Sequence, residues 1–382
     1  MPTLAFPKET LGGEKRCALL PANVKAYKLL GVDVLIESGL GDGIHLHDEV
    51  YKQAGAKVAD NRQTLFQSAD VILGIHKLPQ HELALCRPDT LLISYLDPFN
   101  APDYLEQLCQ QRLTSISMEM IPRISRCQKM DALSSQASLA GYVMVAKAVS
   151  ALQSVLPMMM TPAGTLKPAK VFVIGAGVAG LQAIATAKRL GAAVTAFDTR
   201  TVVAEQVQSL GAKFLQIDLG ETGQTNQGYA QSLTAEQMQK QQQGQAKCIA
   251  ESDIVITTAQ LFGRKPPLLI DANTIAQMKP GSVIVDMAAE NGGNVAGSVA
   301  GETVCVSGVT IIGTGNWANE VASDASQMYA SNLVNLFSEF CDAATGSLSL
   351  DLQDEILGHC VITHQGQIVN QTIQSHFQKE VA

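Results

Sequence analysis

The chain has 382 residues, enough for two domains of ordinary size. Apolar residues make up 46% and charged residues 16%, which excludes a disordered chain and is typical of α/β enzymes. The net charge is −8 without any run of Lys and Arg, so a nucleic-acid-binding surface is not expected. No stretch approaches the roughly 20 apolar residues that span a bilayer, and the N-terminus lacks the features of a secretion signal. We therefore expect a cytoplasmic protein without membrane insertion.

The first predicted elements alternate between strands and helices. Strands are expected at residues 3–6, 32–36, 71–75, 91–95 and 114–118, and helices at 23–30, 63–68 and 101–111. This alternation predicts a parallel sheet covered by helices on both faces. An Ala-rich helix over 134–152 follows and is long enough to connect two domains. The methionines 158–160 after it are interpreted as core packing.

A second alternating set begins near residue 169. Strands are expected at 171–174, 194–197, 213–217, 253–258, 282–286 and 310–312, with helices at 181–190, 203–210 and 235–243. A long helix over 322–340 and a small hairpin at 358–362 and 367–369 end the chain. We therefore predict an α/β protein with two Rossmann-like domains, whose parallel sheets are separated by an NAD-binding cleft. The first domain takes residues 1–133 plus 325–382, and the second takes 134–324.

The strongest motif is Gly175-x-Gly177-x-x-Gly180, which follows a predicted strand and begins a helix. Gly175 permits the tight turn, Gly177 allows a pyrophosphate to approach the backbone, and Gly180 allows close packing of helix on strand. The helix N-terminus offers N–H groups and partial positive charge to phosphates. The motif predicts dinucleotide binding.

Asp198 ends the next strand, 23 positions after Gly175, where an acidic residue accepts the ribose hydroxyls of adenosine. A 2′-phosphate would meet this carboxylate, which favours NAD(H) over NADP(H). Arg200 lies two residues further on and is the side chain that could serve a 2′-phosphate instead.

A polar cluster follows the strand at 114–118. Its guanidinium, amide, carboxylate and hydroxyl groups suit a nicotinamide carboxamide and ribose, and they come from Arg123, Arg126, Gln128, Asp131, Ser134 and Ser135. The alternative is structural: Asp131 or Ser134 caps the helix that follows, and the arginines are solvated. The residues alone leave both interpretations open.

Two further features suggest little metal chemistry and one mobile segment. The eight cysteines contain no Cys-x-x-Cys pair and the histidines no His-Glu-x-x-His pattern, so reduced thiols and no metal are expected. The Gln-rich stretch between Gly220 and Gly244 is either a functional loop or a solvated surface helix.

The chain resembles proton-translocating NAD(P) transhydrogenase, in particular domain I of its alpha subunit, which binds NAD(H). The resemblance covers nearly the whole chain and rests on residues 122–126, 130–135, 140–142, 173–191, 279–286 and 291–294. Because the chain ends soon after the predicted hairpin, it resembles the split form, with the membrane part on a separate chain. Alanine dehydrogenase is a relative with the same two-domain layout.

The resemblance implies a set of cofactor contacts. Arg123, Gln128 and Asp131 are the expected catalytic positions, and Gln128 is expected between two nicotinamides. The full expected set is Arg123, Gln128, Lys129, Met130, Asp131, Ser134, Gly175, Gly177, Val178, Gly180, Asp198, Thr199, Arg200, Gly228, Gln241 and Gln260. Gly228, Tyr229 and Gln241 match a loop that closes over NAD(H) in this family.

The implied reaction is direct hydride transfer from NADH to NADP⁺, which a partner domain holds. It needs proximity and orientation and no general base. The implied partners are a second copy of the chain, an NADP(H)-binding beta subunit or domain III, and a membrane subunit carrying the proton channel. The protein would then be peripheral to the inner membrane through these partners.

Some positions differ from the family's usual residues, including Cys127, Lys129 and Val143. The segment Gly313–Glu320, which contains the only tryptophan, also differs. These differences bear on partner docking and keep a non-catalytic NAD(H) sensor as an alternative.

An alanine dehydrogenase is the second alternative. Lys77 and Arg16 could bind its substrate, but Asp97 stands where its acid–base histidine is expected, and a carboxylate replaces an imidazole poorly at neutral pH.

Overall fold

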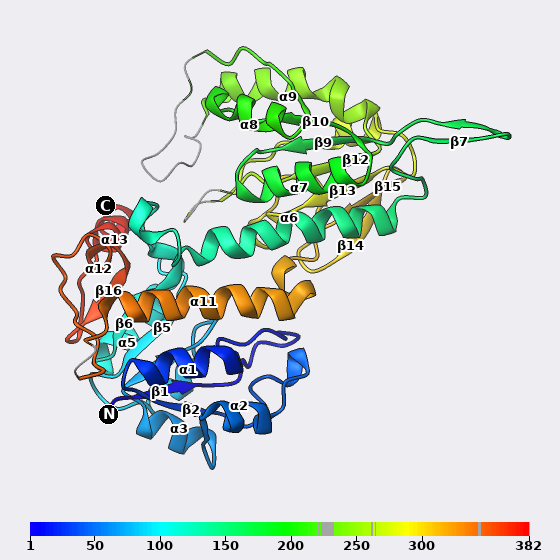
Figure 1. The fold of residues 1–382 in the computed structure, drawn as a ribbon. Coiled ribbons are helices and arrows are strands. Elements are labelled where there is room, and N and C mark those ends of the chain that lie inside the picture. The colour runs from blue at the N-terminus through cyan, green and yellow to red at the C-terminus, as the bar shows by residue number, and fades with distance from the viewer. Residues whose placement is uncertain (221, 223–232, 261–262, 264, 343–344, 382) are drawn as a thin grey trace. The chain divides into compact units, whose positions relative to one another are not determined.

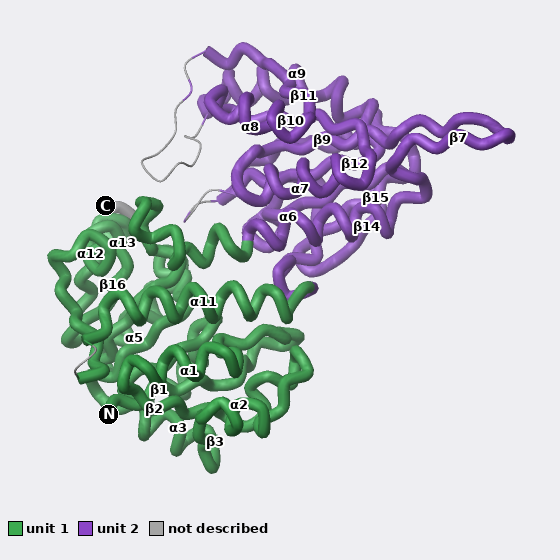
Figure 2. Tube along the Cα trace, viewed as in Figure 1, with its two compact units in different colours: residues 1–136, 321–382 green, residues 137–320 purple. Residues whose placement is uncertain are grey.

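A computed structural model describes residues 1–220, 222, 233–260, 263, 265–342 and 345–381. The chain divides into two compact units, unit 1 with residues 1–136 and 321–382 and unit 2 with residues 137–320 (Figure 2). Each unit has its own sheet flanked by helices (Figure 1), which confirms the predicted α/β class. No helix in the described part of the chain has the length and apolarity to cross a bilayer.

The sheet of unit 1 has eight strands in the order β17-β16-β6-β5-β4-β1-β2-β3. Six are parallel: β1 (Thr3–Phe6), β2 (Asp33–Ile36), β3 (Lys57–Val58), β4 (Val71–Leu73), β5 (Leu91–Ser94) and β6 (Thr114–Ser117). The predicted tail hairpin forms as β16 (Val361–His364) and β17 (Gln367–Ile368), and β16 pairs antiparallel with β6. The sheet is therefore mixed rather than wholly parallel.

The helices of unit 1 bury aromatic side chains against this sheet. They are α1 (Pro21–Leu29), α2 (Asp48–Ala54), α3 (Arg62–Ser68), α4 (Gln80–Leu83), α5 (Pro102–Gln110), α11 (Ala322–Phe340), α12 (Leu357–Cys360) and α13 (Gln371–Val381). The ring of Tyr27 on α1 lies 5.6 Å from Phe6 of β1 and 5.5 Å from Phe337 of α11. This contact joins the C-terminal helix to the N-terminal strands, so both ends of the chain build one core.

The sheet of unit 2 has the order β11-β10-β9-β12-β13-β15-β14. Its strands are β9 (Lys170–Ile174), β10 (Ala193–Phe197), β11 (Lys213–Phe214), β12 (Ile254–Thr257), β13 (Val283–Asp286), β14 (Thr303–Val306) and β15 (Val309–Ile312). All are parallel except the edge strand β14, which the sequence did not predict. The first six follow the usual doubly wound order, whose switch point lies between β9 and β12. Ligands of such sheets bind at the carboxyl ends of these two strands.

The helices of unit 2 correct two predicted boundaries. They are α7 (Val178–Arg189), α8 (Ala204–Ser209), α9 (Ala235–Glu251) and α10 (Ala272–Ala276), while α6 (Ala132–Ala151) runs from unit 1 into unit 2. α7 begins at Val178 rather than at 181, so Gly180 lies in its first turn. α9 continues through Gly244 to Glu251 rather than ending at 243, and it buries Gln241, Gln245 and Ile249. The interpretation of this stretch as a solvated surface helix is therefore wrong.

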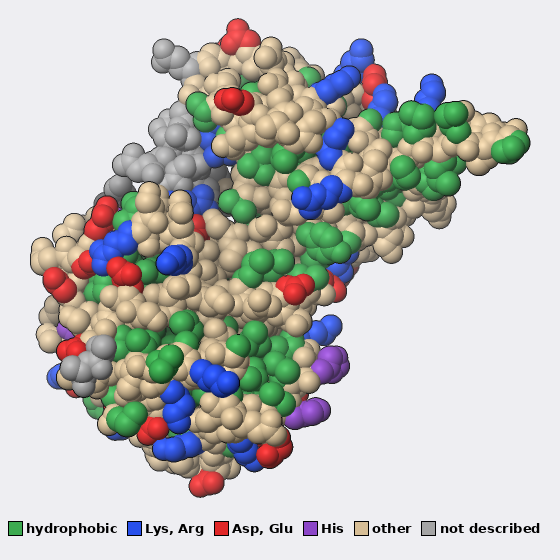
Figure 3. All heavy atoms as spheres, in the orientation of Figure 1, with side chains coloured by type: hydrophobic (Ala, Val, Ile, Leu, Met, Phe, Trp, Pro, Cys, Tyr) green, Lys and Arg blue, Asp and Glu red, His purple; other side chains and the backbone are tan. Residues whose placement is uncertain are grey.

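The methionines 158–160 are not core residues. They lie in a hairpin formed by β7 (Met159–Thr161) and β8 (Gly164–Leu166). Met158 is 59% exposed and Met160 75% exposed, and Leu166 is exposed on the other strand. Figure 3 shows these hydrophobic side chains along the arm that carries the β7 label in Figure 1. The prediction failed because an apolar run indicates burial without indicating which surface covers it.

Candidate functional site

The glycine-rich turn after β9 has the geometry that the motif predicts. Gly175 has a φ of +101°, which only glycine adopts without strain. A Cβ on Gly180 would lie 1.9 Å from the carbonyl oxygen of Gly175, whereas a Cβ on Gly177 would meet no atom within 4 Å. The turn is therefore packed tightly at its two ends and open at Gly177, the side on which a pyrophosphate would approach.

The N-terminus of α7 is available to an anion. Gly177 is the N-cap residue, and no side chain accepts a hydrogen bond from the first turn. The first N–H groups of a helix have no partner within the helix, and they carry a partial positive charge. Val178 in this turn is 38% exposed. The open glycine and the uncapped helix end fit a dinucleotide phosphate.

Asp198 closes this turn on one side. Its Oδ2 accepts a hydrogen bond of 2.7 Å from the backbone nitrogen of Ala176. Arg200 donates to the same carboxylate from its backbone nitrogen, Nε and Nη2, at 2.8, 2.9 and 2.8 Å. This hydrogen bonding raises the pKa of Arg200. The carboxylate thus lies beside the phosphate-binding turn, and the guanidinium that could serve a 2′-phosphate is held by it.

The carboxyl end of β12 completes the site in unit 2. The Oγ1 of Thr258 donates to the carbonyl oxygen of Gly175 at 3.1 Å, which places this strand end against the glycine turn. Gln260, two residues further on, is exposed and donates to the carbonyl oxygen of Met287 at 3.4 Å. Gln241 of α9 is buried, and its Oε1 has no hydrogen-bond partner among the described residues. Both amides stand among groups that a nucleotide would need.

Sequence reasoning missed the residue that fixes this strand end. Asn294 is fully buried, and its Nδ2 donates to the carbonyl oxygens of Ala259 (3.0 Å) and Pro267 (2.9 Å). Its backbone nitrogen donates to Asp286 at 3.0 Å. Asn294 therefore ties both ends of the segment that carries Gln260. The only signal in the sequence is Asn-Gly-Gly-Asn after β13, a pattern typical of a turn that does not by itself indicate which backbone groups the last asparagine binds.

The polar cluster of unit 1 shows the structural interpretation directly. Asp131 accepts hydrogen bonds from the nitrogen of Ser134 (2.8 Å) and from its Oγ (2.6 Å), so it caps α6. Arg123 lies near the same carboxylate, with 3.9 Å between Nε and Oδ2. Capping uses the carboxylate without burying it, because Asp131 and Ser134 remain half exposed. The cap therefore positions the two side chains and leaves them accessible.

The remaining predicted residues of this cluster differ in exposure. Gln128 and Lys129 are exposed, whereas Met130 is 2% exposed, so its side chain supports the segment from inside. Arg126 is held by Glu339 and Asp354, each at 2.7 Å. Gly228 lies outside the described residues. The structure thus brings Arg123, Gln128, Asp131 and Ser134 together on one segment of unit 1, and the other predicted contacts belong to unit 2.

The residues considered for an amino-acid substrate are engaged with each other. Arg16 donates to Glu14 from Nε at 2.8 Å and from Nη2 at 2.7 Å, and both side chains are buried. His76 contacts the same carboxylate at 2.8 Å. Lys77 lies over the ring of Tyr104. A protein carboxylate therefore already occupies the guanidinium that would bind a substrate carboxylate.

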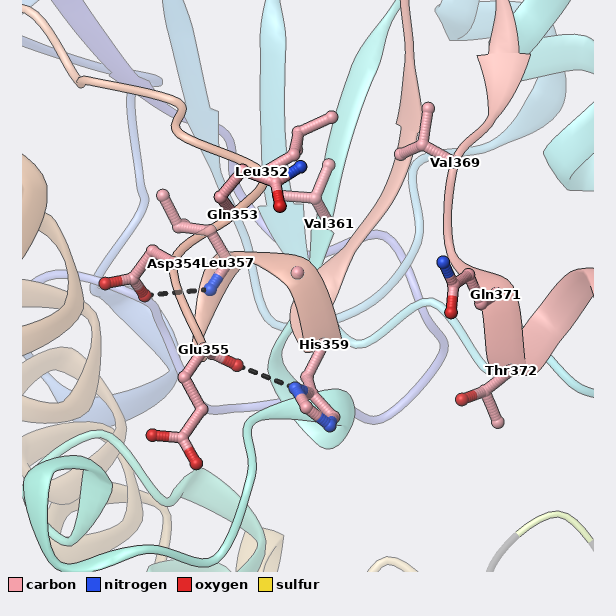
Figure 4. A pocket seen from close by; sticks show the side chains of 11 residues that line it. Leu352, Gln353, Asp354, Glu355, Leu357, His359, Val361, Val369, Gln371 and Thr372 are labelled. Carbon is pink, nitrogen blue, oxygen red and sulfur yellow. Dashed lines mark hydrogen bonds between the residues drawn. The ribbon is translucent and has the colours of Figure 1, made fainter.

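A surface hollow of about 410 Å³ lies in unit 1 between α12 and α13. Figure 4 shows Asp354, Glu355 and His359 on one side of it and Gln371 and Thr372 on the other. None of the residues predicted for the cofactor lines it. Asp354 connects it to the polar cluster only through the ion pair with Arg126. The residues that line the hollow include no nucleophile or cation that would assign it a chemistry.

The doubly wound sheet, the open glycine turn and the carboxylate beside it define a nucleotide-binding α/β protein of the dehydrogenase type. Two family models match the chain: the N-terminal domain of alanine dehydrogenase/PNT at residues 5–140 and the C-terminal domain at residues 144–371. The chain belongs to this family.

Curated and solved relatives agree with this assignment. The first of the separate chains that make up NAD(P) transhydrogenase subunit alpha in Rhodospirillum rubrum is 41% identical over 96% of this chain and 97% of its own length. The crystal structure of transhydrogenase from Sinorhizobium meliloti has a TM-score of 0.87 and 42% identity, and the match covers 96% of this chain and 100% of that one. A structure of L-alanine dehydrogenase has a TM-score of 0.81 and 25% identity, covering 99% of both chains.

Proposed function

We propose that this chain is the NAD(H)-binding component of a proton-translocating NAD(P) transhydrogenase, the first chain of a split alpha subunit. The observation that carries the proposal is the glycine turn with Asp198 beside it, within a chain that matches a transhydrogenase alpha subunit along nearly the full length of both. Bound NAD(H) would supply the hydride, and NADP(H) held on a partner domain would accept or return it. The net reaction is NADH plus NADP⁺ giving NAD⁺ plus NADPH.

The residues of unit 2 hold the dinucleotide and select it. The N–H groups at the start of α7 bind the pyrophosphate, and Gly177 leaves room for it. Asp198 accepts from the adenosine ribose and repels a 2′-phosphate, so NAD(H) is preferred. Val178 and Thr199 contact the adenosine half, and Gly228, Gln241 and Gln260 cover the cofactor.

The residues of unit 1 orient the nicotinamide end. Arg123, Asp131 and Ser134 provide a guanidinium, a carboxylate and a hydroxyl within one short segment, and Gln128 presents an exposed amide beside them. Lys129 and Met130 complete the segment. No proton has to move in the transfer, so these groups act by orienting the reacting carbons at about 3–3.5 Å. Proton translocation belongs to a separate membrane subunit, to which this chain would be peripheral.

A second copy of the chain is the proposed partner of the β7–β8 hairpin. The hairpin exposes Met158, Met159, Met160 and Leu166, apolar side chains that are costly to leave in water. Methionine adapts its shape to the surface that it meets. A homodimer would cover this arm.

A titration with NADH and with NADPH, followed by an assay with a purified NADP(H)-binding transhydrogenase domain, tests the proposal. We expect NADH to bind more tightly than NADPH, and NADPH to form from NADH only after the partner domain is added. NADH binding without transfer would instead indicate a non-catalytic NAD(H) sensor. Oxidation of alanine without a partner would indicate an alanine dehydrogenase, a function that the pairing of Arg16 with Glu14 disfavours.

A further inference from the structure

One buried side chain of α11 holds the segment that carries the proposed nicotinamide contacts. Asn332 is 7% exposed, and its Nδ2 donates to the carbonyl oxygen of Lys129 at 2.8 Å. Its Oδ1 accepts a hydrogen bond from the Oγ of Ser135, also at 2.8 Å. The second bond fixes which way the amide faces, because the oxygen must point to the hydroxyl and the nitrogen to the carbonyl.

The position of this contact on the segment matters more than its number of bonds. Lys129 follows Gln128 directly and precedes Asp131 by two residues. The carbonyl of Lys129 is therefore the backbone group between the exposed amide of Gln128 and the carboxylate of Asp131. A residue that fixes this carbonyl limits how both side chains can be directed.

Other contacts hold the segment at its ends but leave its centre to α11. Arg126 is fixed by Glu339 and Asp354 on one side, and the nitrogens of Met130 and Asp131 donate to the carbonyl oxygen of Cys127. Asn335 adds a longer bond of 3.3 Å to the carbonyl of Lys129, but its side chain also donates to Ser331. Asn332 supplies the short, buried bond.

We propose that Asn332 is a positioning residue for hydride transfer, acting through the carbonyl of Lys129 on Gln128 and Asp131. The inference rests on the proposed function, since it assigns a role within that reaction. Asn332 itself does not touch the cofactor. Its loss should leave the nucleotide contacts of unit 2 intact and disturb the orientation of the nicotinamide end. A displacement of about 1 Å at a reacting centre lowers a rate by up to roughly 100-fold.

The test compares two buried asparagines of unit 1. Asn332→Ala removes the proposed positioning contact. Asn370→Ala is the matched control, because Asn370 is 2% exposed and its Nδ2 donates to the carbonyl oxygens of His359 and Val361, remote from residues 123–134 in sequence. Both variants should lower the melting temperature. For each variant, NADH affinity is measured by fluorescence titration, and transfer to NADP⁺ on the added partner domain is measured by stopped flow under saturating NADH.

Asn332→Ala is expected to slow transfer at least about tenfold while changing NADH affinity less than about threefold. Asn370→Ala should leave both unchanged, and amide hydrogen exchange over residues 123–131 should rise in Asn332→Ala alone. An unchanged transfer rate in folded Asn332→Ala, or an equal loss in Asn370→Ala, would overturn the inference while leaving the proposed function standing. Should Asn332→Ala fail to fold, Ser135→Ala decides, and an unchanged rate in that variant overturns it. Absence of transfer in the wild type would overturn the proposed function and this inference together.

Discussion

The carboxylate of Asp198 accepts hydrogen bonds from Arg200 and from the glycine turn at the same time. At the scale of single residues, this pairing sets cofactor choice in two ways. The carboxylate repels a 2′-phosphate, and it also holds the guanidinium that would otherwise attract one. Asp198 therefore acts both as a ligand and as a restraint on Arg200.

Asp198→Asn should weaken NADH binding by about tenfold, because hydrogen bonds to a charged acceptor are worth roughly 1.5–3 kcal/mol. It should at the same time strengthen NADPH binding, since Arg200 is released and the negative charge is gone. The ratio of the two affinities, measured by fluorescence titration, checks this. The double variant with Arg200→Gln should lose the gain for NADPH. Unchanged NADH affinity in Asp198→Asn would refute the ribose assignment.

Glu14 makes a second prediction at this scale. Burial alone would raise the pKa of Glu14, but hydrogen bonds from Arg16 and His76 outweigh it and hold the pKa well below its usual range. A carboxylate whose pKa is lower in the folded state contributes stability that is full above its unfolded pKa of about 4.3 and is lost as the pH falls through the folded value. The contribution should therefore be complete at neutral pH and decline in acid.

Glu14→Gln should lower the free energy of unfolding at neutral pH by about 3 kcal/mol, because it leaves Arg16 buried without its partner. The difference from wild type should shrink below about pH 4, where the wild-type carboxyl also becomes protonated. Urea unfolding followed by circular dichroism at several pH values measures it. Glu49→Gln is the control, because its pair with Lys52 is exposed, and it should cost less than about 1 kcal/mol. A difference that does not vary with pH would contradict the assignment.

At the scale of elements, the phosphate-binding end of α7 depends on close packing against α6. A Cβ on Gly141 of α6 would lie 2.2 Å from the carbonyl oxygen of Ala179, and no side-chain rotation relieves contact with a backbone atom. The two helices therefore approach closely because position 141 lacks a side chain. The Ala-rich helix was predicted as a connection, but its close contact with the cofactor-binding helix was not.

Gly141→Ala should displace α7 or α6 and destabilise the protein by about 1–3 kcal/mol. NADH affinity should fall with it, since the start of α7 binds the pyrophosphate. Calorimetric melting and NADH titration measure the two effects. Gly12→Ala is the control, because a Cβ there meets nothing within 4 Å. Equal stability of the two variants would contradict the packing argument.

The elements around the cofactor could be predicted because local signals agree there: an apolar strand, glycines at fixed spacing and an acidic residue at the next strand end. Asp131 shows where this fails, because its carboxylate caps α6 and the same residue type would also suit a ribose. The burial of Gln241 and the tie made by Asn294 depend on contacts between distant parts of the chain, which composition does not encode. The β7–β8 hairpin was missed because exposure of methionine contradicts its usual place.

At the scale of the whole molecule, the exposed hairpin predicts self-association. Met158→Glu with Met160→Glu should convert a dimer into a monomer, because each charge would have to be buried in the interface. Sedimentation velocity measures the mass. Leu29→Glu is the control, since Leu29 is 88% exposed on α1 and lies far from the hairpin in sequence. A wild type that sediments as a monomer would refute the proposed dimer.

The most direct test of hydride transfer on this chain follows the hydride itself. NADH carrying deuterium at the transferred position of the nicotinamide is mixed with this chain and an NADP⁺-loaded partner domain, and the NADPH formed is analysed by mass spectrometry. We expect the deuterium to appear in NADPH without exchange with solvent, and Gln128→Asn to slow its arrival while NADH binding holds. NADPH without the label, or no NADPH at all, would contradict direct transfer on this chain.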